Sequence, residues 1–543
     1  MKKVLLSAFL LAALQSNAQL YINNGTLYID NGAVVSVAGN VESNTNIQVN
    51  GPTGTGKLLL NGTGAQNVNM NGFAIPNLEI NNAANVTLTG AAKVSNNLNL
   101  VNGKVLLGSN NLSLANTATV TGQGDTRYIV SNGTGELRKE ISAAGTYSLP
   151  VGNASTYNPV EIVQTGGTFS NAYVGVRNIE GKHPNAHVRV SEFLKTYWSL
   201  TSSGITGGTR TATGTYNNAS FEVTAPGVEA DIYAFNYNGT QWALGTAQNA
   251  ANNTVSMNVA ASGTQHLYGM NKFVLAVPKV FLQGAYNSST GLMNDLLRTS
   301  AAYSIGSLPA SNLLPLTDPY RTAPYNANFS HVNNANAETI SSDVLKDLAN
   351  PNDQIVDWVF VELRERSSNT VAPVIQTRAA LLQRDGDVVD IDGVSPLFFK
   401  NLDAKATYVV AVRHRNHIGL SSNPATASSL GLQSTAIDLT TGTIFGTANT
   451  NYGVVNGKNV LYAGNANSNT NVRYGGPSND KDYLLSTILG GNSVLLQSNV
   501  YSVGDLNMNR NVRYSGPSND KDYLLSTILN GSSVVIKSQV LPN

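Results

Sequence analysis

The sequence predicts a mainly β, multidomain, secreted protein: an N-terminal β-solenoid, then β-sandwich domains, then a small C-terminal module of loop-helix repeats. Three observations predict this organisation. An apolar leader opens the chain, apolar residues recur at i and i+2 between Asn-Gly steps, and one phrase occurs twice near the C-terminus. The composition, with 12% charged residues and 50 glycines, suits turns and sheet surfaces.

Residues 1–18 are predicted to be a signal peptide. Two lysines precede an apolar run from Val4 to Leu14, and the small residues Ser16 and Ala18 stand where a signal peptidase cuts. The alternative, a buried N-terminal helix, needs polar interruptions that this run lacks. We therefore expect a secreted chain that acts extracellularly or at the outer cell surface. No later stretch approaches the roughly 18 apolar residues that span a bilayer, so no transmembrane segment is expected.

Cysteine content and charge exclude several classes of chemistry. The chain has no cysteine, which excludes disulfides, thiolate catalysis and Cys-based zinc sites. Its 33 Lys and Arg residues nearly balance 32 Asp and Glu residues, and no basic block is present. Such a surface argues against nucleic acid and anionic membranes as partners.

Residues 19–124 are predicted to form the β-solenoid. Apolar pairs with period two, such as those at Leu58, Leu78 and Leu98, indicate short strands. Asn-Gly steps between the pairs favour tight turns. The three pairs begin 20 residues apart, which is about one coil of a solenoid that stacks its inward side chains. A meandering sandwich is the alternative.

Residues 125–277 and 278–445 are predicted to be two β-sandwich domains, the second with a long Pro/Asn-rich insertion from about Ser307 to Ala337. In the second domain, LDAKATYVVAVRHRNHIGLSS resembles the penultimate strand of fibronectin type III domains, with Leu402 six residues before Tyr408. The resemblance implies a tyrosine corner, in which the Tyr408 phenol donates a hydrogen bond to nearby backbone.

Several motifs suggest chemistry that their context does not support. GPTGTGK (51–57) matches a phosphate-binding loop, but Leu58 replaces the magnesium-binding hydroxyl and a strand follows instead of a helix. No Gly-x-Ser-x-Gly elbow nominates a nucleophile. No catalytic residue is predicted.

Two histidine pairs are interpreted as surface residues without a metal role. His183 and His187 lack the acid and the helix of a metalloprotease site. His414 and His417 stand at a strand end, where side chains point to opposite faces by default.

Four acids lie between residues 384 and 393: Asp385, Asp387, Asp390 and Asp392. They offer oxygen ligands for calcium. A hairpin with solvent-facing carboxylates is favoured, because the acids alternate with apolar residues.

Residues 446–543 contain the repeated phrase. NVRYGGPSNDKDYLLSTIL begins at Asn471, and NVRYSGPSNDKDYLLSTIL begins at Asn511. Each NDKDYLLSTIL is predicted to be a helix, with Asn479 or Asn519 as its N-cap. Upstream, oxygen-bearing side chains alternate as in an EF-hand-type loop: Asn465, Asn467, Asn469 and Asn471 in the first copy, and Asp505, Asn507, Asn509 and Asn511 in the second.

A loop and a helix, present twice, resemble the dockerin-type calcium module. The resemblance implies calcium as a cofactor, held by Asp505, Asn507, Asn509, Asn511, Asp520 and Asp522. The sixth-position glycine is replaced by Thr470 or Arg510, and the twelfth-position acid by Gly476 or Gly516. The first loop should bind calcium more weakly, because no acid stands among its alternating ligands. The two apolar helix faces are expected to pack together as halves of one unit.

From about Val277 to Asn543, phrases such as VDWVFVELRE, together with the repeats, resemble a group of gram-negative secreted and cell-surface proteins described as haemagglutinin-like. The resemblance implies a non-catalytic adhesin that binds surface glycan or matrix. A polysaccharide-active enzyme is one alternative, although only Trp198, Trp242 and Trp358 could serve as tryptophan platforms for sugar. The other is a scaffold component that binds a protein partner through its dockerin-like tail.

Overall fold

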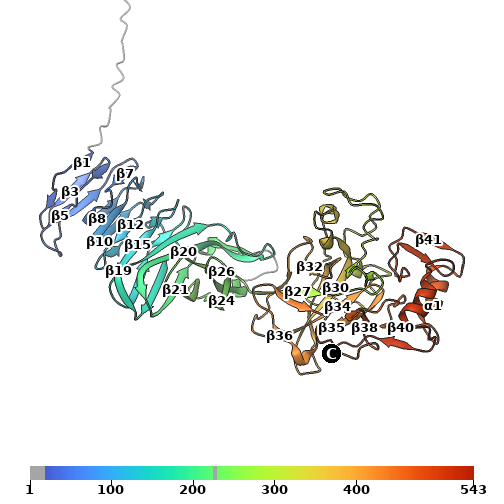
Figure 1. The fold of residues 1–543 in the computed structure, drawn as a ribbon. Coiled ribbons are helices and arrows are strands. Elements are labelled where there is room, and N and C mark those ends of the chain that lie inside the picture. The colour runs from blue at the N-terminus through green and yellow to red at the C-terminus, as the bar shows by residue number, and fades with distance from the viewer. Residues whose placement is uncertain (1–18, 224–228) are drawn as a thin grey trace, which may run out of the picture. The chain divides into compact units, whose positions relative to one another are not determined.

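The computed structural model describes residues 19–223 and 229–543. The predicted signal peptide, residues 1–18, lies outside them. Two compact units, Met1–Lys272 and Phe273–Asn543, make up the chain (Figure 1). The fold is mainly β, with 43% of residues in strands and 7% in helices, so the predicted fold class is confirmed.

Unit 1 begins with a β-solenoid of about six turns. One face is a parallel sheet of β1 (Leu20–Ile22), β4 (Val41–Ser43), β7 (Gln66–Asn69), β9 (Val86–Leu88), β11 (Val105–Leu106), β14 (Ile129–Val130) and β17 (Val151–Gly152). The other face carries β3 (Val34–Val37), β6 (Lys57–Leu60), β8 (Ala74–Asn81), β10 (Ala92–Asn102), β12 (Leu112–Leu114), β13 (Thr119–Thr121) and β15 (Leu137–Ile141), also parallel. A short sheet joins β2 (Tyr28–Ile29) and β5 (Gln48–Val49).

The predicted column of inward side chains is present in the solenoid. Leu58 is in register with Leu78, and Leu78 with Leu98, on neighbouring parallel strands. All three side chains are buried. Residues 51–56 of GPTGTGK precede β6 and Lys57 begins it, so the motif runs into a strand, as expected.

The sheet of β15 continues into a sandwich without a break. Its antiparallel part contains β19 (Thr168–Glu180), β20 (Glu192–Thr206), β22 (Phe221–Val223), β23 (Ile232–Tyr237), β24 (Trp242–Ala247) and β26 (Gln265–Asn271). The second layer contains β16 (Gly145–Leu149), β18 (Val160–Thr165), β21 (Thr209–Thr215) and β25 (Thr254–Val259). The short 3-10 turns are η1 (Asn218–Ser220) and η2 (Glu229–Asp231). The predicted boundary at residue 124 therefore falls between neighbouring strands of one sheet, β12 and β15.

Unit 2 is built on a second, sandwich-like arrangement of sheets. The larger sheet contains β30 (Ile355–Glu365), β31 (Val374–Gln383), β32 (Val388–Val389), β34 (Thr407–His414), β35 (His417–Ser421) and β36 (Ser428–Ser429). The smaller one contains β27 (Phe273–Lys279), β33 (Leu397–Lys400) and β37 (Thr435–Asp438). The Tyr408 phenol donates to the Asp403 carbonyl at 2.8 Å, which is the backbone hydrogen bond expected for this tyrosine.

Buried ion pairs fix the long insertion between β29 and β30. The fully buried Arg298 guanidinium lies 2.6 Å from Asp295 and 2.6 Å from Asp347. Strands β28 (Tyr286–Asn287) and β29 (Leu292–Met293) precede the insertion, which contains η3 (Pro319–Arg321), η4 (Ser342–Leu345) and η5 (Pro351–Asp353). Apolar residues of the insertion, such as Leu314, Tyr320 and Ile340, also belong to the buried core of unit 2.

The acidic cluster of residues 384–393 lies at the hairpin of β31 and β32, as predicted. Asp387 lies 2.8 Å from the Lys279 ammonium. The prediction that all four carboxylates face solvent is wrong for Asp390, which is buried 2.8 Å from the Arg378 guanidinium. A charged partner in the adjoining strand makes this burial possible.

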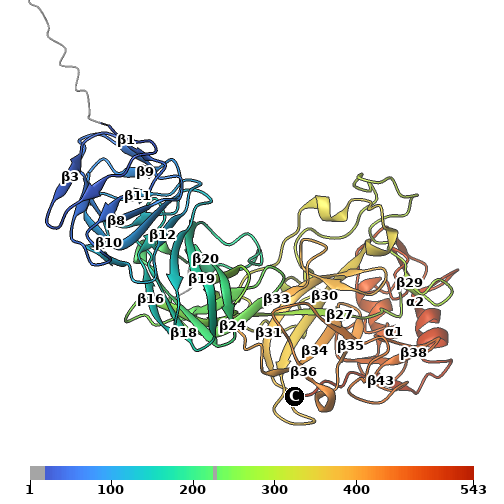
Figure 2. The same cartoon turned by 60° about the vertical axis from the view of Figure 1, so that its left-hand side comes forward.

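The C-terminal residues of unit 2 contain the two repeats. After η6 (Pro424–Thr426) and the hairpin of β38 (Gly453–Val455) and β39 (Lys458–Val460), β40 (Asn471–Arg473) pairs with β43 (Ile536–Ser538), and β41 (Leu496–Ser498) pairs with β42 (Asn511–Arg513). Helix α1 (Asp480–Tyr483) continues as the π-helical turn η7 (Leu484–Ile488), and α2 (Asp520–Asp522) as η8 (Tyr523–Ile528). Figure 2 shows both helices in red.

Candidate functional site

The predicted N-caps start both helices. Asn479 Oδ1 accepts the Asp482 amide at 2.8 Å, and Asn519 Oδ1 accepts the Asp522 amide at 2.7 Å. Each asparagine also donates its side-chain amide to the same aspartate's carboxylate at 2.7 Å. The asparagine oxygen satisfies one backbone donor that each helix start would otherwise leave free, so the repeated Asn-x-x-Asp spacing fixes where each helix begins.

The first acid of each helix closes the loop that precedes it. The Asp480 carboxylate accepts the backbone amides of Ala466 and Arg473, each at 2.9 Å. Asp520 does the same for Leu506 at 2.8 Å and Arg513 at 2.9 Å. Burial raises the pKa of Asp480 to about 7. Both carboxylates therefore lie inside the loops, where they hold the backbone in a compact curve.

The sixth loop position has the backbone that a glycine would favour. Thr470 has φ of +68° and Arg510 has φ of +74°, both in the left-handed region. In the second loop Asp505 supports this conformation, since its carboxylate accepts the amides of Asn509 and Arg510 at 2.9 Å each. Both loops thus place a non-glycine residue in the left-handed conformation at this position.

Each helix packs onto the loop of the other repeat. A Cβ placed on Gly464 would lie 3.2 Å from Ile528 Cδ1, and one on Gly504 would lie 3.0 Å from Ile488 Cδ1. Leu524 and Val472 share one buried cluster, and Leu484 and Val512 share another. The helices also contact each other, as expected, because Tyr483 and Ile488 of the first helix pack against the cluster that contains Leu524 and Ile528 of the second.

A groove opens on the surface of each repeat, with a volume of about 540 Å³ in the first and about 510 Å³ in the second. Both grooves lie between the loop asparagines and the start of the helix. The first is lined by Asn467, Asn469, Gly476, Pro477, Ser478, Asn479, Asp482, Tyr483 and Ser486. The second is lined by Asn507, Asn509, Gly516, Ser518, Asn519, Asp522, Tyr523, Ser526 and Thr527. The repeat thus presents the same polar surface twice.

The structure divides the predicted calcium ligands into two sets. Asp505 and Asp520 are fully buried beneath the second loop. Asn507, Asn509 and Asp522 line the groove above it. Asn511 is outside both sets, and its side-chain amide donates to the Asn509 carbonyl at 3.0 Å. Over residues 19–223 and 229–543, no group of three or more His, Cys, Asp or Glu residues could hold a metal.

The second loop brings two buried carboxylates close enough to repel each other. Burial raises the pKa of Asp505 to about 6, and burial with repulsion from Asp505 raises the pKa of Asp520 well above its usual range. Two carboxylates that repel each other are stabilised by a divalent cation. Each already accepts backbone amides, yet a carboxylate has about four lone-pair positions.

The first loop offers a weaker set of donors. Asn465 replaces the first acid, and its Oδ1 is buried with no hydrogen-bond partner in the described parts of the chain. The neutral amide removes one of the two buried charges that the second loop contains. The predicted difference in calcium affinity between the loops remains a prediction.

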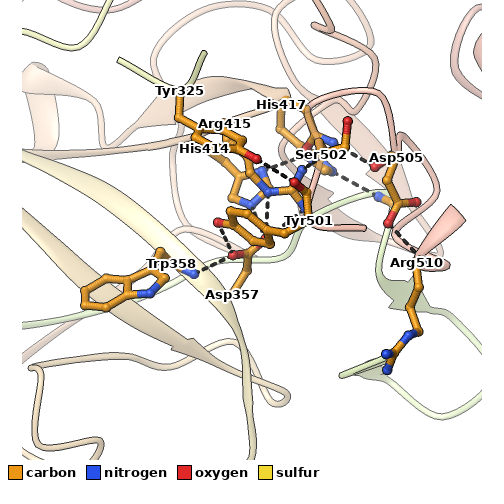
Figure 3. Close-up of polar contacts among 12 residues, drawn as sticks. Tyr325, Asp357, Trp358, His414, Arg415, His417, Tyr501, Ser502, Asp505 and Arg510 are labelled. Carbon is orange, nitrogen blue, oxygen red and sulfur yellow. Dashed lines mark hydrogen bonds and ion pairs between the residues drawn. The ribbon is translucent and has the colours of Figure 1, made fainter. Parts of the chain in front are cut away.

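The sequence reasoning missed a buried polar network in the sandwich (Figure 3). The Asp357 carboxylate accepts His414 Nε2 at 3.0 Å and Arg415 Nε at 3.1 Å through one oxygen. Its other oxygen accepts the Tyr501 hydroxyl and the Trp358 amide, each at 2.8 Å. Hydrogen bonds and opposite charge hold the pKa of Asp357 low, although burial alone would raise it. The network joins strand β30 to the second repeat.

Two interpretations of histidines as surface residues are wrong. His414 and His417 are buried cross-strand partners whose Nδ1 atoms lie 3.0 Å apart, because the turn between β34 and β35 has only two residues. His183 is buried too, with its Nε2 2.7 Å from His266 Nδ1. Burial lowers the pKa of all three, that of His183 to about 4. The sequence signal that could have indicated the burial of His414 and His417 is the polar stretch RHRN inside an apolar hairpin.

The turn between β34 and β35 binds the second repeat directly. Asn416 donates its side-chain amide to the Asp505 carbonyl at 2.7 Å. Arg415 donates to the Ser502 carbonyl, and its guanidinium lies 4.4 Å from the centroid of the Tyr501 ring. The predicted tail, residues 446–543, therefore shares a polar core with the sandwich and belongs to unit 2.

Comparisons with protein-family models, curated proteins and solved structures find no match to this chain. The resemblances to fibronectin type III domains, dockerins and haemagglutinin-like proteins therefore stay predictions. Among the helices that the structure describes, none is long and apolar enough to cross a membrane.

Proposed function

We propose that this chain is a non-catalytic, secreted adhesin that binds glycan or matrix at the outer cell surface. The observation that carries the proposal is the pair of equivalent grooves in the C-terminal repeats. The grooves repeat the same kinds of side chain at matching positions, including the exposed aspartates Asp482 and Asp522. A ligand with repeated units can occupy two matched grooves of this kind at the same time.

The groove chemistry favours a ligand rich in hydroxyl groups. Asn469, Asp482 and Ser486 present an amide, a carboxylate and a hydroxyl to the first groove. These groups donate and accept as sugar hydroxyls do. The half-buried ring of Tyr483 adds an apolar edge with a polar tip. Both volumes lie in the range of roughly 300–1,000 Å³ that small-ligand sites occupy.

Two sites on one folded module strengthen binding to a polymer. Reciprocal packing holds both grooves in one folded module, so a polymer bound in the first groove stays tethered to the module that carries the second. The second contact is then intramolecular and increases the overall affinity without any new contact chemistry. Adhesion to a surface with repeated ligands benefits directly from this arrangement.

Calcium is the cofactor that we propose for the second loop. Asp505, Asp520, Asn507 and Asn509 would hold it through their side-chain oxygens. When bound, the cation neutralises the two buried carboxylates and stiffens the wall of the groove. The protein groups alone define the groove surface that the ligand contacts.

A binding assay on immobilised glycans and matrix proteins tests the proposal. We expect the full chain to bind, and the double variant Asp482→Ala/Asp522→Ala to lose binding. The matched control is Asp343→Ala, because Asp343 is also an exposed aspartate in a first turn with a lysine partner, Lys346 at 2.7 Å. A wild-type chain that binds no surface contradicts the proposal.

Two further results decide between the alternatives. Reducing ends released from a polysaccharide panel by the pure chain would support a polysaccharide-active enzyme. A protein recovered through the repeats, with no binding to glycan or matrix, would support a scaffold component. Either result replaces the adhesin.

A further inference from the structure

A further groove lies in unit 1, where the solenoid becomes the sandwich. Strand β15 is parallel to β12 on one side and antiparallel to β19 on the other. Next to this change of direction, β19 loses register with β20 between Phe169 and Tyr173, and Asn171 adopts φ of +47°. Bulges of this kind redirect side chains, and here the bulged segment lines a cavity of about 420 Å³.

The groove combines one ion pair with amides and a hydroxyl. Lys93 Nζ lies 2.8 Å and 3.0 Å from the two oxygens of Glu140, and both side chains are partly exposed. Asn116 donates its side-chain amide to the Ser142 hydroxyl at 2.7 Å. The cavity is lined by Lys93, Asn116, Glu140, Ile141, Ser142, Phe169, Asn171, Ala172 and Tyr173.

Two aromatic side chains complete the lining. Phe169 and Tyr173 are both half-buried and stand on either side of the bulge. The Arg138 guanidinium lies 4.6 Å from the Tyr173 ring centroid and fixes the orientation of that ring. The groove therefore offers apolar ring surface beside directed hydrogen-bonding groups, which is the usual composition of a small-ligand site.

We propose that this groove binds a neutral saccharide. The Lys93 ammonium and the Glu140 carboxylate cancel in charge, so neither an anion nor a cation gains net attraction. The same pair can donate to and accept from neighbouring hydroxyls of a sugar ring, as can the Asn116 and Asn171 amides. The Phe169 and Tyr173 rings match the apolar C–H face of a pyranose. This site is independent of the C-terminal grooves and extends the proposed function to unit 1.

The test measures binding of soluble tetrasaccharides of glucose, mannose, xylose and N-acetylglucosamine to the full chain by titration calorimetry. We expect at least one to bind, and to bind Asp482→Ala/Asp522→Ala equally well. Glu140→Gln, which keeps the side-chain shape, and Tyr173→Ala should each weaken binding about tenfold, equivalent to about 1.4 kcal/mol. Tyr28→Ala is the control, because Tyr28 is 52% exposed on a solenoid strand outside the groove.

The inference is overturned if no tetrasaccharide binds, if only sulfated or carboxylated analogues bind, or if Glu140→Gln and Tyr173→Ala both keep wild-type affinity. Binding that disappears in the Asp482→Ala/Asp522→Ala variant also overturns it, while it supports the proposed function of the repeats. Tetrasaccharide binding through Glu140 and Tyr173, in a chain that adheres to no surface, supports this inference and contradicts the adhesin.

Discussion

The Asp357 carboxylate and the Arg415 guanidinium lie 3.1 Å apart, and neither side chain is exposed to solvent. Asp357 belongs to β30, while Arg415 belongs to the turn that contacts the second repeat. A buried ion pair of this kind contributes little net free energy compared with apolar packing, but it cannot lose one partner without a large penalty. It therefore fixes the repeats to the sandwich in one arrangement.

Asp357→Asn should destabilise unit 2 by about 3–5 kcal/mol, since it leaves the Arg415 charge buried without its partner. Denaturant unfolding of the full chain, followed by tryptophan fluorescence, measures the change. Asp343→Asn is the control, because Asp343 is 70% exposed and should change stability by less than about 0.5 kcal/mol. Equal effects of the two substitutions would show that the network carries no special role.

Asp480 makes the first repeat sensitive to pH. Its folded pKa of about 7 lies above the unfolded value of 3.8, so between these values the folded state binds more protons than the unfolded state. This carboxyl therefore favours folding most below pH 4, and its contribution is lost as pH rises to about 7. Urea unfolding of calcium-free protein from pH 4 to 8 should show the stability difference between wild type and Asp480→Asn change with pH over this window. A stability difference that stays constant from pH 4 to 8 contradicts the raised pKa of Asp480.

Calcium should raise the unfolding temperature of the full chain. Calcium that binds the folded state alone raises the free energy of unfolding by roughly 2.7 kcal/mol when its concentration is about a hundredfold above Kd. Asp505→Asn should remove most of this gain, because a hard cation responds to ligand charge, whereas Asn465→Asp should add a gain in the first loop. Thermal unfolding with calcium and with chelator measures both. An unchanged midpoint would mean that the loops are held by Asp480 and Asp520 alone.

Truncating the isoleucine that each helix packs against the opposite loop, Ile528 or Ile488, should lower the stability of unit 2. Ile528→Ala should cost about 2–5 kcal/mol as a buried large-to-small change. Ile488→Ala should cost less, because Ile488 is only partly buried whereas Ile528 is 1% exposed. Denaturant unfolding measures both, with Val494→Ala as the control, since Val494 is 82% exposed. The reverse order of effects is inconsistent with the packing described.

Local patterns predicted local structure well. Leu58, Leu78 and Leu98 gave the solenoid column, because strand period and coil length are both visible in spacing. The N-caps Asn479 and Asn519 were identified because capping depends on residues within one turn.

Long-range contacts could not be predicted in the same way. The burial of His414 and His417 depends on a two-residue turn and on Asp357, which is far away in the sequence. The groove at β15 and β19 depends on a bulge whose position no apolar period marks. Both arise from how strands meet, which spacing along one strand does not encode.

Because each helix contacts the loop of the other repeat, the repeats of this module are complete only in pairs. The two copies begin at Asn471 and Asn511, 40 residues apart. The helix of each copy packs on the loop of the other. Deleting one copy would leave one apolar helix without a loop and one loop without a cover. Adding a third copy would leave the helix and the loop of that copy without partners. The closed unit is therefore the pair, and a chain of this kind can lengthen or shorten without exposing apolar surface only by two repeats at a time.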